Sequence, residues 1–169
     1  DYVGLRDPEG RRRTEQAEGF FIAEGITVLG RLLDSPHRLR SVLLLPSRYE
    51  RLAPLLDTLE APVYVVTRDV MAAVAGFDLH RGVVAAADRP LERPLDELLA
   101  PARLVVVTEG LNDPENLGAI ARSARAFGAD ALLLDPTCAD PLARRTVRVS
   151  MGEILHLPVA RITNWPTGL

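Results

Sequence analysis

Short apolar runs alternate with segments of helical pattern along the first half of the chain, and this alternation constrains the fold more than any other feature. Residues 25–33, for example, repeat isoleucine and leucine on one side of a helix. The order α-β-α-β-α-β-α-β predicts an α/β unit in which helices cover the faces of a sheet. The runs that we assign to strands are FFIA (20–23), SVLLLP (41–46), VYVV (63–66) and GVVAAA (82–87).

A proline-rich stretch interrupts this alternation. DRPLERPLDELLAPAR (88–103) contains three of the 13 prolines, and a residue before proline favours extended geometry. We therefore predict a linker over residues 91–102, with one short helical turn near 95–100. The linker separates a first domain, residues 1–90, from a second, residues 103–169. The second domain begins with a strand LVVVT (104–108), a helix at about 115–127 and a strand ALLL (131–134).

The loop and helix EGLNDPENLGAIARSARAFG (109–128) follow a strand at the position where open α/β sheets bind ligands. Asp113 is suited to cap the helix and Gly128 to end it. Folding does not account for Asn116 and Arg122, which are polar and lie outside the apolar stripe. On a regular helix they are about 120° apart, so they flank one pocket only if the first turn opens toward a ligand. The apolar stripe, which we predict to be buried, consists of Leu117, Ile120, Ala121, Ala124 and Phe127.

Charge is unevenly distributed over the chain, whose net charge is −3 and whose 20 basic residues are all arginine. Residues 1–51 carry nine arginines against eight acids, and residues 137–169 carry four against two. Residues 52–136 carry seven against thirteen. The net charge argues against a uniformly basic nucleic-acid binder. The use of arginine alone, which a GC-rich genome would also produce, is weak evidence for RNA.

Several classes of protein are excluded by what the sequence lacks. No apolar run has the length that a membrane span needs, and DYVGLRDPEGRRRTEQ at the N-terminus is not an apolar leader. Cys138 is the single cysteine, which excludes an intrachain disulfide and a cysteine-based metal site. No glycine-rich nucleotide motif and no histidine-rich metal spacing occurs. We expect a cytoplasmic protein with no metal and no membrane partner.

A second polar stretch, ARRTVRVSMGEILHLP (143–158), by itself predicts a surface helix with basic residues. Together with the first stretch it carries a resemblance to a known family. DPENLGAIARSARAFGADALLL followed by VRVSMGEILHLPVAR resembles the first two motifs of the SpoU (TrmH-like) RNA methyltransferases of the SPOUT class. FFIAEG and HRGVVA resemble the N-terminal substrate-binding domain of that family, which is similar to a small ribosomal-protein fold that binds RNA.

The resemblance implies that a homodimer transfers methyl from S-adenosylmethionine to a ribose 2′-hydroxyl of ribosomal or transfer RNA. The functional Asn and Arg of the first motif map onto Asn116 and Arg122. A guanidinium, with a pKa above ~12, does not readily accept a proton, so we expect Arg122 to bind the phosphate beside the target ribose. Asn116 would orient Arg122 or the ribose. The second motif contributes Arg148, Ser150 and Gly152, and we expect RNA contacts from Arg11, Arg12, Arg13, His80, Arg81, Arg145 and Arg148.

The third motif of the family, a Pro-containing loop followed by Ser-Leu-Asn-type residues, has no counterpart in the chain. By resemblance, the α/β knot and most cofactor contacts lie beyond Leu169. We therefore expect a fragment of a longer enzyme, with an incomplete pocket that does not bind S-adenosylmethionine measurably by itself. Two alternatives stay open. One is a non-enzymatic RNA-binding module that has lost catalysis, and the other is a nucleotide-binding α/β protein that holds phosphate at residues 113–116.

Overall fold

The structure, a computed structural model, describes residues 1–91 and 94–168. It divides into two compact units, Asp1–Arg89 and Pro90–Leu169. Residues 92 and 93, which fall in the predicted linker, and Leu169, the last residue of the predicted second domain, lie outside the described residues. The predicted α/β class is confirmed, because each unit has its own sheet with helices packed on it. No helix in the described ranges is long and apolar enough to cross a membrane.

The first unit alternates helices and strands in the order that the apolar runs predict. Its elements are α1 (Pro8–Ala17), β1 (Phe20–Glu24), α2 (Ile26–Leu33), β2 (Leu39–Leu44), α3 (Pro46–Leu56), β3 (Val63–Val65), α4 (Arg68–Ala75) and β4 (Val83–Asp88). The strands form one sheet in the order β1-β4-β2-β3. β4 pairs antiparallel with β1 and with β2, whereas β2 and β3 are parallel.

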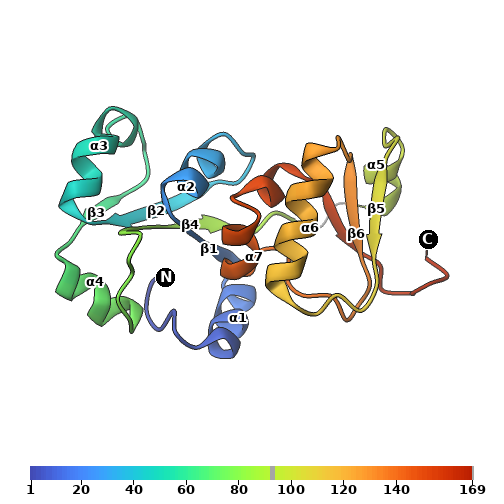
Figure 1. Ribbon diagram of the computed structural model, residues 1–169, viewed down its shortest axis with the longest axis horizontal. Coiled ribbons are helices and arrows are strands. Elements are labelled where there is room, and N and C mark those ends of the chain that lie inside the picture. The colour runs from blue at the N-terminus through green and yellow to red at the C-terminus, as the bar shows by residue number, and fades with distance from the viewer. Residues whose placement is uncertain (92–93, 169) are drawn as a thin grey trace. The chain divides into compact units, whose positions relative to one another are not determined.

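Both faces of the first sheet are covered. All five residues of β1 are buried, so this strand has no solvent face. Phe20 and Ile22 belong to a core that includes Met71 of α4. Figure 1 shows α1 and α4 on one side of the sheet and α2 and α3 on the other. The result is the arrangement of a sheet between helices that the sequence predicts.

The second unit contains a parallel sheet of three strands. Its elements are α5 (Leu95–Leu99), β5 (Val105–Thr108), α6 (Pro114–Ala126), β6 (Ala131–Leu134), α7 (Arg144–Val149), the 3-10 turn η1 (Glu153–His156) and β7 (Val159–Arg161). The strand order is β5-β6-β7. Thr108 pairs in register with Leu134, and Leu134 with Arg161, so the three strands end at one level. The loops that follow them share one edge of the sheet, which is where open α/β sheets bind ligands.

Helix α5 lies inside the segment predicted as a linker. Leu98 is buried and packs with Ala131, Leu133 and Ile162 on one face of the second sheet. Figure 1 shows α6 on the other face. The helical turn predicted near residues 95–100 is therefore part of the core of the second unit.

Helix α6 begins and ends as the sequence predicts. The Asp113 carboxylate accepts a hydrogen bond from the backbone N–H of Asn116 at 2.8 Å, and Gly128 follows the helix at φ +78°. Leu117 is fully buried, but the prediction for Phe127 is wrong, because this side chain is 83 % exposed. Phe127 follows the last helical residue and lies beside β5, where no further strand extends the sheet among the described residues.

Helices α6 and α7 approach closely at a glycine. A methyl group on Gly118 would lie 2.7 Å from the carbonyl oxygen of Thr146 and 3.0 Å from Cβ of Val149. Thr146 is fully buried at this contact. Since the nearest atom belongs to the backbone, it cannot rotate away as a flexible side chain would. The position of α7 therefore depends on the absence of a side chain at Gly118.

We expect Gly118→Ala to lower the free energy of unfolding by about 1–3 kcal/mol, because α7 must move to admit the methyl group. The matched control is Gly30→Ala in α2, where a Cβ meets nothing within 4 Å. That substitution should stabilise the chain by about 0.5–1 kcal/mol, since it removes a glycine from a helix interior. Urea unfolding followed by circular dichroism measures both. Equal effects would contradict the close packing at Gly118.

Candidate functional site

Asp135 follows β6 directly and joins two of the loops at the carboxyl edge of the second sheet. Its side chain is buried. One carboxylate oxygen accepts a hydrogen bond from the backbone N–H of Cys138 at 2.8 Å, and the other accepts one from the N–H of Gly110 at 3.0 Å. The N–H of Ala139 also donates to the carbonyl of Leu111 at 2.8 Å. The loop after β6 is thereby attached to the loop after β5.

Arg161, the last residue of β7, holds the same loop from the third strand. Its guanidinium donates to the backbone carbonyls of Asp135 at 2.6 Å, Cys138 at 3.1 Å and Ala139 at 3.1 Å. The hydroxyl of Thr108, at the end of β5, lies 3.4 Å from the sulfur of Cys138. Side chains from the ends of all three strands therefore meet around one loop. We call the following residues the strand-end network: Thr108, Gly110, Asp135, Cys138 and Arg161.

The strand-end network keeps Asp135 ionised. Burial acts to raise the pKa of its carboxyl, but hydrogen bonds from Cys138, Gly110 and Thr137 outweigh burial and lower that pKa to about 2. Thr137 contributes both its backbone N–H, at 2.9 Å, and its hydroxyl, at 3.0 Å. Because both oxygens already accept several hydrogen bonds, Asp135 is a structural carboxylate and not a proton acceptor at neutral pH.

The lowered pKa of Asp135 predicts how stability depends on pH. A free aspartate has a pKa near 3.9, so the contribution of this carboxylate is fully present above about pH 4 and is lost as the pH falls toward 2. We therefore expect Asp135→Asn to destabilise the second unit at pH 7, and the difference from the parent to shrink between pH 4 and pH 2. Asp34→Asn, at an exposed position, is the matched control for the loss of a carboxylate.

The measurement is the free energy of unfolding in urea at a series of pH values, followed by tryptophan fluorescence. Trp165 is the single tryptophan of the chain and lies in the second unit, so its signal reports on that unit. A difference between parent and Asp135→Asn that stays constant from pH 7 to pH 2 would contradict the lowered pKa.

Asn116 and Arg122 are both exposed on α6, and the helix is regular between them. Neither side chain makes a hydrogen bond or an ion pair with a residue that the structure describes. Six residues of regular helix separate them by about 9 Å along the axis and about 120° around it. The first turn does not open, so the described residues do not bring these two side chains to one pocket.

Arg122 shares a side of α6 with α7. Gly118, about one turn earlier, contacts α7, and Glu115, two turns earlier, lies 3.6 Å from a guanidinium nitrogen of Arg145 and 3.9 Å from one of Arg148. Residues at this spacing lie on the same side of a helix. The structure therefore places Arg122, Arg145 and Arg148, the α6–α7 arginine group, on one side of the second unit.

The other residues of the second motif are used by the fold. Ser150 is fully buried, and its hydroxyl donates to the carbonyl of Val147 at 3.0 Å. Gly152, at φ +84°, follows Met151 at φ +54°, and these two left-handed residues turn the chain from α7 into η1. Ser150 and Gly152 therefore shape the packing of α7 and offer no free side-chain group to a ligand.

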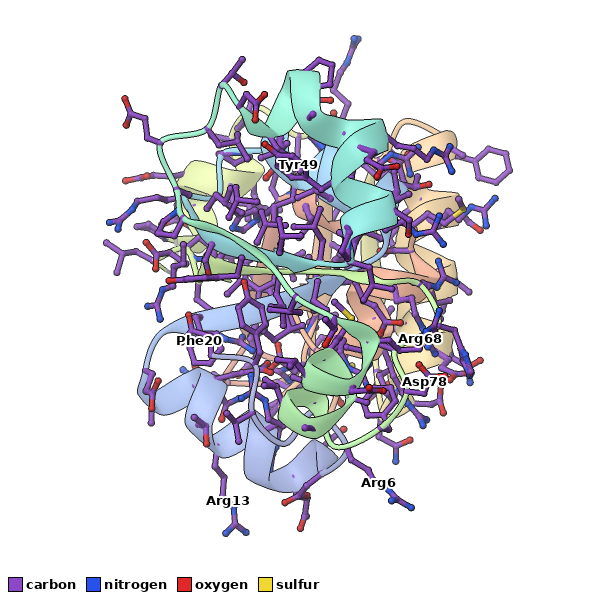
Figure 2. All side chains as sticks on the ribbon, turned by 90° about the vertical axis from the view of Figure 1, so that its left-hand side faces the viewer. Arg6, Arg13, Phe20, Tyr49, Arg68 and Asp78 are labelled. Carbon is purple, nitrogen blue, oxygen red and sulfur yellow. The ribbon has the colours of Figure 1, made fainter. Side chains whose placement is uncertain are left out.

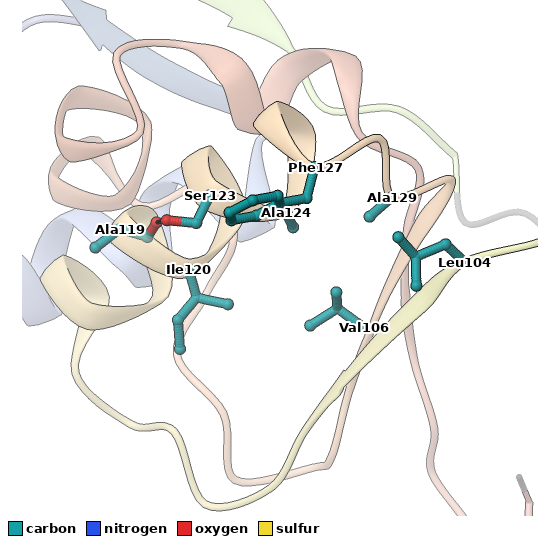
Figure 3. A pocket seen from close by; sticks show the side chains of 8 residues that line it. All are labelled: Leu104, Val106, Ala119, Ile120, Ser123, Ala124, Phe127 and Ala129. Atoms are coloured by element: carbon teal, nitrogen blue, oxygen red, sulfur yellow. Dashed lines mark hydrogen bonds between the residues drawn. The ribbon is translucent and has the colours of Figure 1, made fainter.

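An open groove of about 360 Å³ lies between α6 and the edge strand β5. Figure 3 shows Ile120 and Val106 pointing into it from the two elements. Its lining is apolar apart from the hydroxyl of Ser123 and includes no ionisable side chain, so it has the character of a packing surface and not of a catalytic pocket. The lining residues are Leu104, Val106, Ala119, Ile120, Ser123, Ala124, Phe127 and Ala129.

The three consecutive arginines predicted to contact RNA have different environments on α1. Arg11 pairs with the buried Glu15 at 3.1 Å, and its guanidinium carbon lies 5.2 Å from the ring centre of Phe20. Arg12 and Arg13 are exposed, and Figure 2 shows Arg13 pointing away from the unit, with Phe20 inside it. Arg11 therefore holds α1 on the sheet, and the other two arginines face solvent.

His80 and Arg81 are exposed in the turn before β4. The Nδ1 atom of His80 lies 3.5 Å from a carboxylate oxygen of Asp78. Arg81 lies beside Gly25, because a Cβ placed on Gly25 would be 3.1 Å from the Cδ atom of Arg81. Gly25 follows the end of β1, whereas Phe20, beside Arg11, begins that strand. The two sets of exposed basic residues in the first unit are thus near opposite ends of β1, a strand about 15 Å long.

The SpoU rRNA Methylase family model matches residues 103–169, which include the strand-end network and the α6–α7 arginine group. An uncharacterized tRNA/rRNA methyltransferase of Mycobacterium tuberculosis is 45 % identical over 172 residues, covering 100 % of this chain and 59 % of that protein. The 23S rRNA (guanosine-2'-O-)-methyltransferase RlmB of Haemophilus influenzae is 37 % identical, covering 79 % of this chain and 58 % of that protein. Residues 103–169 thus match the SpoU family, and the chain as a whole is similar to tRNA and rRNA methyltransferases.

A solved structure agrees with this similarity. The SpoU methyltransferase AviRb from Streptomyces viridochromogenes, in complex with the cofactor AdoMet, superposes with a TM-score of 0.74 and 25 % identity, covering 90 % of this chain and 59 % of that one. The resemblance predicted from the two motifs is confirmed. The chain spans 59 % of the length of its Mycobacterium tuberculosis relative.

Sequence reasoning missed the strand-end network. The signal that was available is a polar residue at or directly after the end of each parallel strand, namely Thr108, Asp135 and Arg161. The motif residues drew attention to α6 and α7 instead. Within residues 1–91 and 94–168, no group of three or more His, Cys, Asp and Glu side chains could hold a metal ion.

Proposed function

We propose that the protein to which this chain belongs methylates a ribose 2′-hydroxyl in ribosomal or transfer RNA, with S-adenosylmethionine as the methyl donor. The proposal concerns the whole protein, because the chain spans 59 % of the length of its Mycobacterium tuberculosis relative. The name of RlmB supports the substrate class, and the AdoMet complex of AviRb supports the cofactor. A homodimer, as the resemblance implies, and a cytoplasmic location, as the sequence predicts, are part of the proposal.

One observation in the molecule carries this proposal. Capping and packing explain most of α6, but Asn116 and Arg122 remain exposed without a partner among the described residues. They stand on the helix that starts from the carboxyl edge of a parallel sheet, where such sheets bind ligands. Folding gives no reason for an amide and a guanidinium at these positions, whereas RNA binding does.

Methyl transfer forms a bond from ribose O2′ to the methyl carbon while the carbon–sulfur bond of the sulfonium breaks and leaves a neutral thioether, and the hydroxyl proton passes to solvent water. A positive charge beside the ribose favours the loss of that proton. Arg122 supplies such a charge and can bind the neighbouring phosphate with two parallel hydrogen bonds. Arg145 and Arg148 add positive charge on the same side, partly offset by Glu115. Asn116 does not contact Arg122, so we assign it a hydrogen bond to the ribose.

Phosphate binding at the start of α6, the basis of the nucleotide-binding alternative, is disfavoured by two acidic side chains. Asp113 already accepts the hydrogen bond of the Asn116 N–H, and Glu115 lies in the first helical turn. A phosphate at this place would meet negative charge. The remaining alternative, an RNA-binding module without catalysis, differs from the proposal in activity alone.

In the full-length protein we expect Arg122→Ala to reduce methyl transfer by at least about 100-fold and to leave the fold intact, because the side chain is exposed. Arg122→Lys should also be poor, since an ammonium group cannot make a bidentate phosphate contact. The matched control is Arg125→Ala on the same helix, which removes the pair with Glu153 at 3.8 Å.

Transfer of labelled methyl groups from S-adenosylmethionine to unmodified ribosomal and transfer RNA measures the effect. Near-parental turnover of Arg122→Ala would remove Arg122 from the mechanism. A parent protein that binds RNA and transfers no methyl group would instead favour the non-enzymatic module.

We further infer that the first unit binds RNA, as its resemblance to a ribosomal-protein-like fold implies, through the exposed side chains of Arg12, Arg13, His80 and Arg81. Arg11 is left out, because it is engaged with Glu15 and Phe20 inside the unit. Each arginine that contacts a phosphate releases counterions on binding, so the affinity should fall as the salt concentration rises.

The slope of log affinity against log salt concentration tests these contacts. We expect the double substitution Arg12→Ala and Arg13→Ala to reduce the slope by about 1.4, and Arg81→Ala to reduce it by about 0.7, for single-stranded RNA. Arg51→Ala, at an exposed position on α3, is the control for loss of charge alone. Binding that does not depend on salt, or equal slopes in all variants, would count against this surface.

A further inference from the structure

We propose that Arg161 is a positioning residue for methyl transfer, which sets the start of α6 through the strand-end network. This inference rests on the proposed function, because it concerns the geometry of the same reaction. The guanidinium of Arg161 donates to the loop after β6 and, among the described residues, contacts no member of the α6–α7 arginine group. Its effect on the reaction would therefore pass through two loops.

The first step of this effect is the contact of Arg161 with the loop after β6. The guanidinium is half-buried and donates to three backbone carbonyls within five residues of that loop, at 2.6, 3.1 and 3.1 Å. Two of its nitrogens are used, so the planar fork fixes the direction of the loop as well as its distance. A lysine in this place has a single nitrogen and cannot reproduce that geometry.

The second step connects this loop to the start of α6. The carboxylate of Asp135 accepts from the N–H of Gly110 at 3.0 Å, and the N–H of Ala139 donates to the carbonyl of Leu111 at 2.8 Å. Residues 110–111 are followed closely by Asp113, which caps the helix. The backbone that leads into α6 is therefore held from the loop that Arg161 holds.

The segment after β7 makes another contact with the same edge. The indole N–H of Trp165 donates to the carboxylate of Glu109 at 2.7 Å. Glu109 directly follows β5, so the loop that begins there is held at Glu109 by Trp165 and at Gly110 by Asp135. Trp165 belongs to the segment after β7, and the backbone carbonyl of Asp135 accepts a hydrogen bond from Arg161. This arrangement leaves the start of α6 little freedom, which a reaction that depends on placement requires.

The first part of the test uses hydrogen–deuterium exchange on the 169-residue chain and needs no activity. In Arg161→Lys we expect exchange to become about tenfold faster in peptides covering residues 109–113 and 135–139, and to stay unchanged in the first unit. Arg125→Lys, also in the second unit, should alter neither segment. Unchanged exchange over residues 109–113 in Arg161→Lys would overturn the proposal. If that variant fails to fold, Asp135→Asn is followed instead, with the same expectation for residues 109–113.

The second part measures methyl transfer by the full-length protein. Arg161→Lys should lower kcat by about 10- to 100-fold and leave the dissociation constant for RNA unchanged, because the loss is one of placement. Faster exchange together with parental kcat would overturn the positioning role. A drop in kcat that matches only the unfolded fraction, measured by circular dichroism, would also overturn it. If the parent itself transfers no methyl group, the proposed function fails, while the exchange data still decide whether Arg161 sets the start of α6.

Discussion

The buried carboxylate of Asp135 is the interaction on which the candidate site depends most. Three parallel strands end in register, so their loops lie side by side, but adjacent loops have no ladder of their own to hold them. The carboxylate of Asp135 accepts hydrogen bonds from N–H groups in the loop after β5 and in the loop after β6. The guanidinium of Arg161 donates to carbonyls in the loop after β6. The pKa of about 2 is a consequence of this arrangement, since a carboxylate surrounded by donors holds its negative charge strongly. An edge that is rigid before a ligand arrives loses little entropy when the ligand binds.

The absence of a side chain at Gly118 determines how closely α7 packs against α6. It lets the backbone of α7 come within contact distance of the α6 axis, and so brings Arg145 and Arg148 beside Glu115. Without that approach the α6–α7 arginine group would be spread over a wider surface. Arg145 and Arg148 both lie beside Glu115, whose carboxylate reduces the repulsion between their guanidinium groups while leaving net positive charge. An anionic polymer is the ligand that suits such a surface.

Much of the fold could be predicted from the sequence because the relevant signals are local. Apolar runs gave the strands of the first unit, and Asp113 and Gly128 gave the ends of α6. The predictions that failed or fell short depended on distant residues. Phe127 continues the apolar spacing but lies beside an edge strand, and Arg11 resembles its neighbours in sequence but reaches Glu15 and Phe20. Arg161 could not be assigned from sequence at all, because its three acceptors are backbone carbonyls more than 20 residues away, and a carbonyl leaves no mark on residue type.

The separation of Asn116 from Arg122 restricts what kind of ligand can use both. A regular helix holds them about 9 Å apart along its axis and about 120° apart around it, and the capped first turn fixes that relation. A single phosphate or a mononucleotide at the start of the helix would reach Asn116 and leave Arg122 unused. A polynucleotide that passes over α6 can place a ribose near the amide and a phosphate near the guanidinium at the same time. Within the described residues, Asn116 and Arg122 do not line one compact pocket. Their spacing is therefore consistent with an extended RNA substrate and argues against a small nucleotide.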